Sequence, residues 1–186
     1  MSFYRYLKSH VKKNPDSVAI IEEDCTVTYG ELCEQVESFA AALSELPLKT
    51  NSKIGLLCLN QKEYLVAYFG ALLKGLPIIP YNFLLKPEDL AFITKDAGID
   101  TLVVDSAFVK PEVIPFFKFF KNKILVGPAD ADQVGEGTLR FEDFLKSGKK
   151  DNAFIKHERE SGIPDVILYT SGTTAKPKGV MLNEEQ

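Results

Sequence analysis

A short polar loop that follows a strand-like run constrains the fold most strongly. Residues 165–169 are mostly apolar and typical of a buried strand, and apolar residues resume at 180–182. The segment between them is rich in hydroxyl and ammonium groups: Thr170, Ser171, Gly172, Thr173, Thr174, Ala175, Lys176, Pro177, Lys178 and Gly179. Such groups can together neutralise a polyphosphate, and Gly172 and Gly179 have no side chain that blocks its approach to the backbone. The stretch therefore predicts a phosphate-binding loop at the end of a strand.

Two other interpretations of this loop were weighed. A Walker A loop needs glycine and then Lys and Ser/Thr at fixed spacing, but Pro177 stands five residues after Gly172, so the spacing is wrong. The interpretation that assigns no function is a flexible surface turn rich in Ser, Thr and Gly. We favour the phosphate-binding loop because its pattern is much longer than a simple glycine motif.

The loop closely resembles the phosphate-binding signature of the adenylate-forming superfamily. This superfamily includes acyl-CoA synthetases, luciferases and the adenylation domains of nonribosomal peptide synthetases. Every position from 169 to 179 matches except Ala175, which stands where the family most often has glycine. Two further segments resemble its first and second core motifs, namely VTYGEL at 27–32 and GALLKGLPIIPYN at 70–82. Within the superfamily, the chain is most similar to the long-chain fatty acid–CoA ligases.

The resemblance implies ATP-dependent chemistry. In members of the family a carboxylate attacks the α-phosphorus of ATP, pyrophosphate leaves, and a thiol, often of coenzyme A, captures the acyl-adenylate. The resemblance assigns nucleotide binding to Thr170, Ser171, Gly172, Thr173, Thr174, Lys176, Lys178 and Gly179. It leaves open which lysine reaches the phosphates. No catalytic residue and no Mg²⁺ ligand is expected here, because the family's later motifs for magnesium, ribose and the catalytic lysine find no match.

These matches predict that residues 1–186 form a partial amino-terminal AMP-binding domain, truncated after the loop at 170–179 and inactive alone. The expected co-substrates are a carboxylic acid, with a fatty acid favoured, ATP and coenzyme A. One alternative is a fragment of an adenylation domain that serves a carrier protein. The other is a non-catalytic module that binds a nucleotide or a partner protein.

Composition argues against several other classes. A content of 45% hydrophobic and 26% charged residues is ordinary for a folded protein, and a net charge of -4 argues against nucleic-acid binding. Cys25, Cys33 and Cys58 have no metal-ligand spacing, which favours a reducing compartment. The sequence shows neither a signal-peptide core nor an apolar run of membrane-spanning length. We therefore expect a cytoplasmic protein, with peripheral contact to a membrane left open.

Apolar strands alternate with amphipathic helices along the chain. Strands are predicted at 17–22, 26–27, 53–59, 76–80, 101–105, 123–126 and 165–169, with an exposed loop at 127–137. Helices are predicted at the amino terminus, after the Thr28–Glu31 capping box, after Asn60 as a cap, from Pro87 and from Pro111, with a short helical patch at 141–145. This alternation predicts an α/β fold with a doubly wound, mostly parallel sheet and flanking helices. In such sheets ligands bind beyond the carboxyl ends of the strands.

Other side chains that could carry chemistry are better explained by structure. His10 and His157 have no partner at a useful spacing, and Asp130 and Asp132 predict a solvated turn because the other positions of a calcium loop are missing. Tyr169 is expected to pack under the loop.

The segment that begins at Pro111 carries a cluster of phenylalanines. If it is helical, one side of the helix holds Phe116, Phe117, Phe119 and Phe120. We expect these rings to pack on the sheet, the alternative being that they dock on a membrane or an acyl chain.

Overall fold

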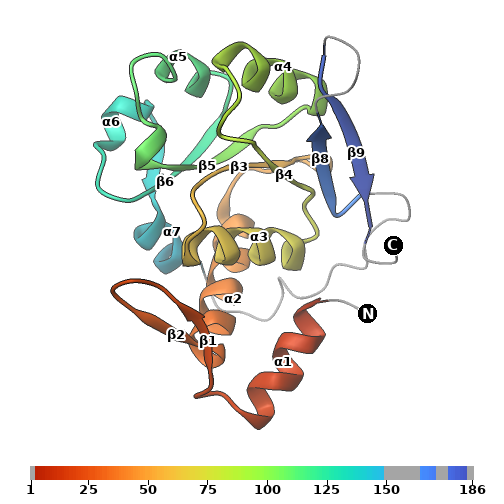
Figure 1. Ribbon diagram of the computed structural model, residues 1–186, viewed down its shortest axis with the longest axis vertical. Coiled ribbons are helices and arrows are strands. Elements are labelled where there is room, and N and C mark those ends of the chain that lie inside the picture. Colours follow the sequence, from red (N-terminus) through yellow and green to blue (C-terminus); the bar gives the residue numbers. More distant parts are fainter. Residues whose placement is uncertain (1–2, 149–163, 171–175, 184–186) are drawn as a thin grey trace.

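A sheet covered on both faces by helices forms the body of the molecule (Figure 1). The computed structural model describes residues 3–148, 164–170 and 176–183. Within these residues the main sheet has seven strands, in the order β7-β6-β5-β3-β4-β8-β9. The strands are β3 Ile54–Leu57, β4 Ile78–Pro80, β5 Thr101–Asp105, β6 Asn122–Val126, β7 Thr138–Arg140, β8 Val166–Thr170 and β9 Lys178–Leu182.

The sheet is parallel from β7 to β8. Its one antiparallel pair in the described residues joins β8 to β9 at the edge. The chain runs from β3 to β4 on one side and then crosses back, so that β5, β6 and β7 extend the sheet from the other side of β3. Later, β8 pairs with β4. The predicted doubly wound, mostly parallel sheet is confirmed.

Two layers of helices cover the two faces of the sheet. Successive side chains of a strand point to opposite faces, so Val103 of β5 joins one core, whereas Leu102 and Val104 join the other. The first core lies under α2, α3 and α7, and the second lies under α4, α5 and α6. These helices are α2 Tyr29–Glu45, α3 Lys62–Lys74, α4 Pro87–Ala97, α5 Ile114–Phe117, α6 Ala131–Val134 and α7 Phe141–Ser147.

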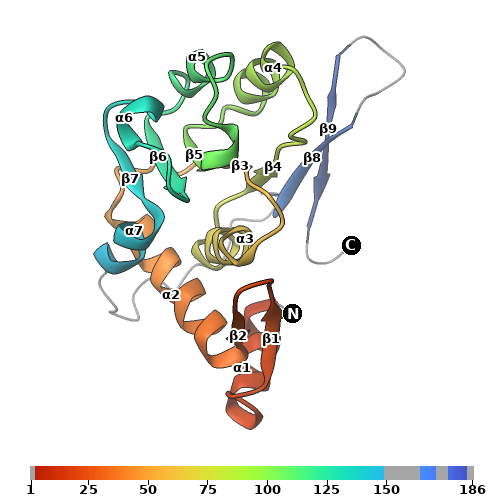
Figure 2. The same cartoon turned by 60° about the vertical axis from the view of Figure 1, so that its left-hand side comes forward.

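The amino-terminal part of the chain packs on α2 (Figure 2). It consists of α1 Phe3–Lys13 and a two-stranded hairpin, β1 Val18–Ile21 and β2 Thr26–Thr28, and it places Leu7 and Val27 in the first core. The predicted capping box of α2 is confirmed. The Thr28 hydroxyl accepts from the Glu31 amide, and the Glu31 carboxylate accepts from the Thr28 amide. This pair therefore has a structural role.

The predicted cap of α3 is wrong. Asn60 does not cap this helix, because the residue at the N-cap is Gln61, whose side chain makes no capping bond. The side-chain amide of Gln61 instead donates to the carboxylate of Asp105. The backbone N–H of Lys62 donates to the carboxylate of Glu22, which comes from the hairpin turn. Contacts with residues distant in the sequence therefore decide where this helix begins.

The helix predicted from Pro111 is also shorter than expected. Only Ile114–Phe117 is α-helical, and the chain continues through tight turns in which the amide of Phe120 donates to the carbonyl of Phe117. Phe116, Phe117 and Phe120 are buried in the second core, but Phe119 is 41% exposed. Packing against the body of the protein is therefore confirmed for three of the four rings.

The predicted loop at 127–137 contains a short helix, α6, and β7 follows it as a strand that was not predicted. Asp130 is the N-cap of α6, and its carboxylate accepts from the amide of Asp132. This agrees with the predicted turn. His157 and the rest of 149–163 lie outside the described residues.

Candidate functional site

The polar loop leaves the sheet at the edge where the parallel strands end. Val166 of β8 pairs in parallel with Ile78 of β4, so the carboxyl end of β8 lies at the same edge as those of β3, β4, β5 and β6. Thr170 is the last residue of β8 and Lys178 is the first residue of β9. Ser171, Gly172, Thr173, Thr174 and Ala175 lie outside the described residues. The structure thus fixes the two ends of the predicted loop at the expected edge.

The two lysines have different surroundings. Lys178 is the cross-strand partner of Thr170, and both side chains are exposed on the hairpin. Lys176 lies in the bend before β9, and its Nζ stands 5.3 Å from the ring centroid of Phe92 on α4. Lys178 therefore belongs to a paired strand, whereas Lys176 makes a cation–π contact with a helix.

Tyr169 joins the strand before the loop to α4. Its hydroxyl donates to Asp96 Oδ2 at 2.6 Å, and burial together with this bond raises its pKa. The phenol therefore stays protonated and serves as a hydrogen-bond donor. A Cβ placed on Gly179 would lie 3.1 Å from Cζ of Tyr169, so the glycine makes room for this ring. Whether Tyr169 packs under the loop stays a prediction, because residues 171–175 lie outside the described residues.

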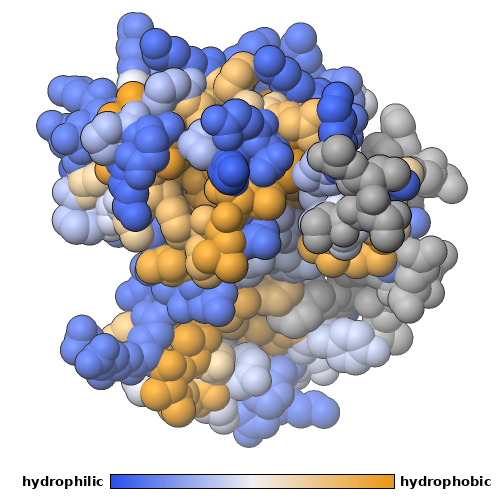
Figure 3. All heavy atoms as spheres, turned by 45° about the horizontal axis from the view of Figure 1, so that its top comes forward, coloured by the Kyte–Doolittle hydropathy of each residue, from blue (hydrophilic) through white to orange (hydrophobic). Residues whose placement is uncertain are grey.

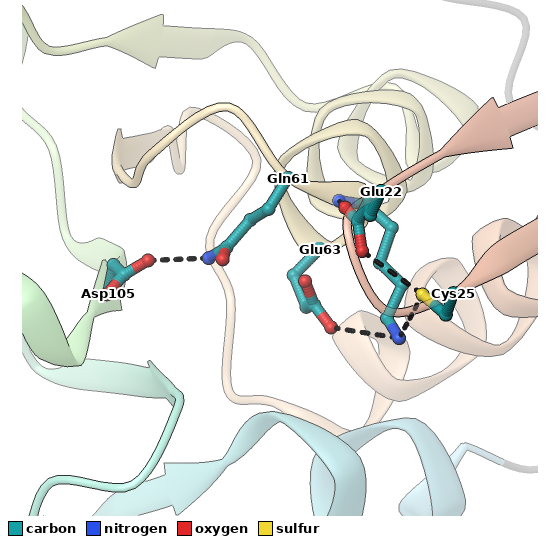
Figure 4. Close-up of polar contacts among 6 residues, drawn as sticks. Glu22, Cys25, Gln61, Glu63 and Asp105 are labelled. Atoms are coloured by element: carbon teal, nitrogen blue, oxygen red, sulfur yellow. Dashed lines mark hydrogen bonds and ion pairs between the residues drawn. The ribbon is translucent and has the colours of Figure 1, made fainter.

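Asp105 is a buried carboxylate at the same edge, and sequence analysis did not single it out. It ends β5, is 5% exposed, and accepts from Gln61 Nε2 at 2.6 Å (Figure 4). Its other oxygen accepts from the amide of Ala107 at 2.7 Å and thereby caps the short helix η1 Ser106–Phe108. Both oxygens are engaged, so Asp105 holds the loops after β3 and β5 together. A signal existed in the sequence, since an aspartate directly after an apolar strand is a common cap.

A second polar group surrounds Lys62 and includes Glu22, Cys25 and Glu63, which Figure 4 labels. The Nζ of Lys62 lies 3.8 Å from Glu63 Oε1 and 3.8 Å from the sulfur of Cys25. The Cys25 thiol in turn donates to Glu22 at 3.4 Å, which raises the pKa of the thiol. A thiol held protonated by a carboxylate is a poor nucleophile. This group therefore connects the β1–β2 hairpin to α3.

Apolar side chains also gather at the carboxyl edge. Leu59 follows β3, Phe83 and Leu84 follow β4, and all three are at least 40% exposed. Phe83 stacks on Phe108 with ring centroids 5.7 Å apart, so the loops after β4 and β5 touch. Figure 3 shows apolar surface in the middle of the face that it presents. Exposed apolar side chains that lie close together are typical of a surface that binds an apolar ligand or partner.

The remaining candidates from the sequence have structural roles. The His10 ring contacts the Tyr29 ring with centroids 4.1 Å apart and an angle of 45° between the ring planes, and all three cysteines are free thiols. Burial raises the pKa of Cys58 well above its ordinary value, which makes this thiol inert. In the described part of the chain, His, Cys, Asp and Glu form no group of three or more that could hold a metal ion. Nor does that part contain a helix long and apolar enough to span a membrane.

Comparison with known proteins identifies the family. The AMP-binding enzyme family matches residues 7–186. The chain belongs to this family. A curated relative, the medium/long-chain-fatty-acid–CoA/3-oxocholest-4-en-26-oate–CoA ligase of Mycobacterium marinum, is 30% identical over 175 residues, which are 92% of this chain and 32% of the relative.

The chain is also similar to a second curated protein and to a solved structure. Bacitracin synthase 1 of Bacillus licheniformis is 24% identical over 184 residues, which are 99% of this chain and 3% of that protein. The crystal structure of a long-chain-fatty-acid–CoA ligase from Archaeoglobus fulgidus superposes with a TM-score of 0.80 at 22% identity, covering 98% of this chain and 36% of that one. That likeness shows the fold. The chain spans about a third of the length of the ligase of Mycobacterium marinum.

Proposed function

We propose that this chain supplies the phosphate-binding part of an ATP-dependent acid–thiol ligase. In the proposed reaction a carboxylate oxygen attacks the α-phosphorus of ATP, the bond to pyrophosphate breaks, and an acyl-adenylate forms. The sulfur of coenzyme A then attacks the acyl carbon and AMP leaves. The observation that carries the proposal is the placement of Thr170 and Lys178, the two ends of a family-specific loop, at the carboxyl edge of the sheet.

The loop would act on the charge that builds up on pyrophosphate as it leaves. Preorganised donors and cations stabilise such charge most when they are aimed at it before the reaction begins. Thr170 offers a hydroxyl and Lys178 an ammonium group, each at an end of a strand pair that fixes its position. Ser171, Gly172, Thr173, Thr174 and Gly179 would add hydroxyl and amide donors. We expect the Mg²⁺ that accompanies ATP to take its ligands from another part of the enzyme.

The proposed acyl substrate is a fatty acid. Leu59, Phe83 and Leu84 provide exposed apolar surface at the carboxyl edge, where Phe83 stacks on the partly buried Phe108 of the neighbouring loop. Such surface suits an alkyl chain better than a polar acid. The relative from Mycobacterium marinum, named for medium- and long-chain fatty acids, supports this choice. The likeness to bacitracin synthase 1 keeps open transfer to a carrier protein in place of coenzyme A. A non-catalytic module that binds a nucleotide or a partner remains the other alternative.

We further propose that the 186-residue chain binds ATP but does not form the adenylate by itself, and that it works in the cytoplasm. Titration calorimetry of the purified chain with MgATP and with pyrophosphate tests the first part. We expect binding of both ligands and its loss in the double variant Lys176→Ala, Lys178→Ala, with circular dichroism unchanged. If the wild-type chain binds neither ligand, or the double variant binds both normally, the phosphate-binding role is wrong.

Exchange of labelled pyrophosphate into ATP tests the second part. The chain should give no exchange with fatty acids of graded length, whereas exchange above the level of a no-acid control would contradict the proposed inactivity. A longer natural protein that contains this chain should exchange with fatty acids. Its use of free coenzyme A or of a carrier-bound thiol then separates the ligase from the carrier-dependent alternative.

A further inference from the structure

Helix α4 contacts the polar loop region on both sides of residues 171–175. Asp96 bonds to Tyr169, which directly precedes the loop, and Phe92 lies under the ammonium group of Lys176, which belongs to its later part. We propose that Phe92 and Asp96 are positioning residues that hold the two ends of the phosphate-binding loop, and that Lys176 is the lysine that anchors the loop. This inference rests on the proposed function and adds a role for a helix outside the family signature.

Helix α4 is itself firmly attached to the sheet. Leu90, Ile93 and Thr94 are buried, and the Thr94 hydroxyl lies 2.6 Å from the hydroxyl of Tyr81, the residue after β4. The helix ends at Gly98 in the left-handed conformation, which fixes its carboxyl end. A helix held in this way can act as a fixed support for a neighbouring hairpin.

The geometry of the two contacts suits a clamp. Phe92 and Asp96 are four residues apart, so they lie on the same face of α4, one turn from each other. Asp96 is exposed and Phe92 is half-buried, which places both at the border between the helix and the hairpin. Because their partners Tyr169 and Lys176 lie on either side of residues 171–175, one helical face holds the chain before and after this central part of the loop.

The two lysines consequently have separate tasks. The ammonium group of Lys176 faces an aromatic ring, whereas Lys178 stands on β9 beside Thr170. Loss of an exposed cation–π contact changes an equilibrium by roughly two- to five-fold. We therefore expect Lys176 to influence phosphate binding indirectly and by a modest factor, and Lys178 to influence it through its charge.

A double-mutant cycle tests this division. MgATP affinity is measured by calorimetry for Phe92→Leu, Lys176→Gln and the combined variant, at several NaCl concentrations from about 50 to about 300 mM. Each single variant should weaken binding roughly two- to five-fold, and the combination should be no worse. The salt dependence of the affinity should match that of the wild type, because a lysine whose charge does not face phosphate adds little to the part of the affinity that salt screens. Phe92→Tyr retains the aromatic face and should restore affinity.

The same helix provides a matched control. Lys95 Nζ stands 4.9 Å from the ring centroid of Phe119, a cation–π contact that does not involve the hairpin. Phe119→Leu should therefore leave MgATP affinity unchanged. If Lys176→Gln flattens the salt dependence, or its effect adds to that of Phe92→Leu, Lys176 contacts phosphate directly. The positioning role would then be wrong while the proposed function stands.

Hydrogen exchange of the ligand-free chain gives an independent test that does not need nucleotide binding. Peptides covering 166–182 should exchange faster in Phe92→Leu and in Asp96→Asn than in the wild type, and at the wild-type rate in Phe119→Leu. Equal rates in all variants would overturn the proposal. If the wild-type chain fails to bind ATP yet exchange follows the expected order, the positioning role holds and the proposed function is the part that fails.

Discussion

Glu37 shows how one side chain can attach a whole helix. It accepts from the Tyr4 hydroxyl at 2.7 Å and forms an ion pair with Lys8, so that two residues of α1 bind one carboxylate on α2. Burial alone would raise the pKa of Glu37, but the hydrogen bonds from Lys8 and Tyr4 outweigh it and leave the pKa below its ordinary value of 4.5. The charged form of Glu37 therefore stabilises the fold.

The sign of this shift predicts how stability depends on pH. A carboxyl group whose pKa is lowered by folding contributes fully above about pH 4.5, and this contribution disappears as the pH falls through the lower pKa of the folded state. Glu37→Gln should cost about 1 kcal/mol at pH 7. Urea unfolding at pH 7 and near pH 3 measures both proteins. The difference between them should shrink at the lower pH, and a difference that stays constant would show that the charge of Glu37 is unimportant.

At the scale of elements, the crossing of α2 and α3 depends on a missing side chain. Gly70 of α3 lies against Phe39 of α2, and a Cβ on Gly70 would come within 2.7 Å of Cδ1 of this ring. Phe39 is fully buried and contacts the rings of Phe141 and Phe144 on α7, so it has little freedom to move. The close approach of the two helices therefore requires glycine in the middle of α3.

Replacing this glycine should destabilise the protein although alanine is the better helix former. Gly70→Ala gains about 1 kcal/mol of helix propensity, but overpacking against Phe39 should cost more, for a net loss of about 1–2 kcal/mol. Thermal and urea unfolding measure this loss. In a Phe39→Leu background the ring is gone, so the same substitution should cost less. An equal cost in both backgrounds would mean that contact with the ring is not the cause.

Elements with strong local signals could be predicted from the sequence, whereas those decided by distant partners could not. The capping box at Thr28 and a strand that includes Ile54–Leu57 could be predicted because each leaves a clear pattern in neighbouring residues. In contrast, β7 has three residues and exists because β6 offers it a partner. The start of α3 differs from the predicted one because Glu22 of the hairpin accepts a hydrogen bond from the backbone N–H of Lys62.

The same reasoning applies to the candidate site. The loop was visible in the sequence as a contiguous pattern, and its place at the carboxyl edge followed from the order of strands and helices. Its contact with α4 was not visible in the sequence, because Tyr169 and Asp96 are 73 residues apart and no sequence motif contains both. Long-range contacts between ordinary residues leave no local signal.

At the scale of the whole molecule, ligand binding and stability are linked. If MgATP binds the folded chain and not the unfolded one, about one hundred times its Kd should stabilise the fold by about 2.7 kcal/mol. For a chain of this size that corresponds to a rise of roughly 5–10 °C in Tm. Scanning calorimetry with and without MgATP measures the shift. The double variant Lys176→Ala, Lys178→Ala should show none, and an equal shift in both proteins would place nucleotide binding elsewhere.

The position of β8 also has a consequence for biosynthesis. β8 lies next to β4 in the sheet. In the sequence, however, β5, β6 and β7 lie between these two strands and are synthesised before β8. As the chain leaves the ribosome, β3 to β7 and their helices can assemble first, because domains form from the amino terminus onward. The edge of β4 must stay unpaired until β8 emerges. The nascent protein therefore carries an open strand edge until the segment bearing the polar loop closes it, which makes this interval the one in which pairing with another chain is easiest.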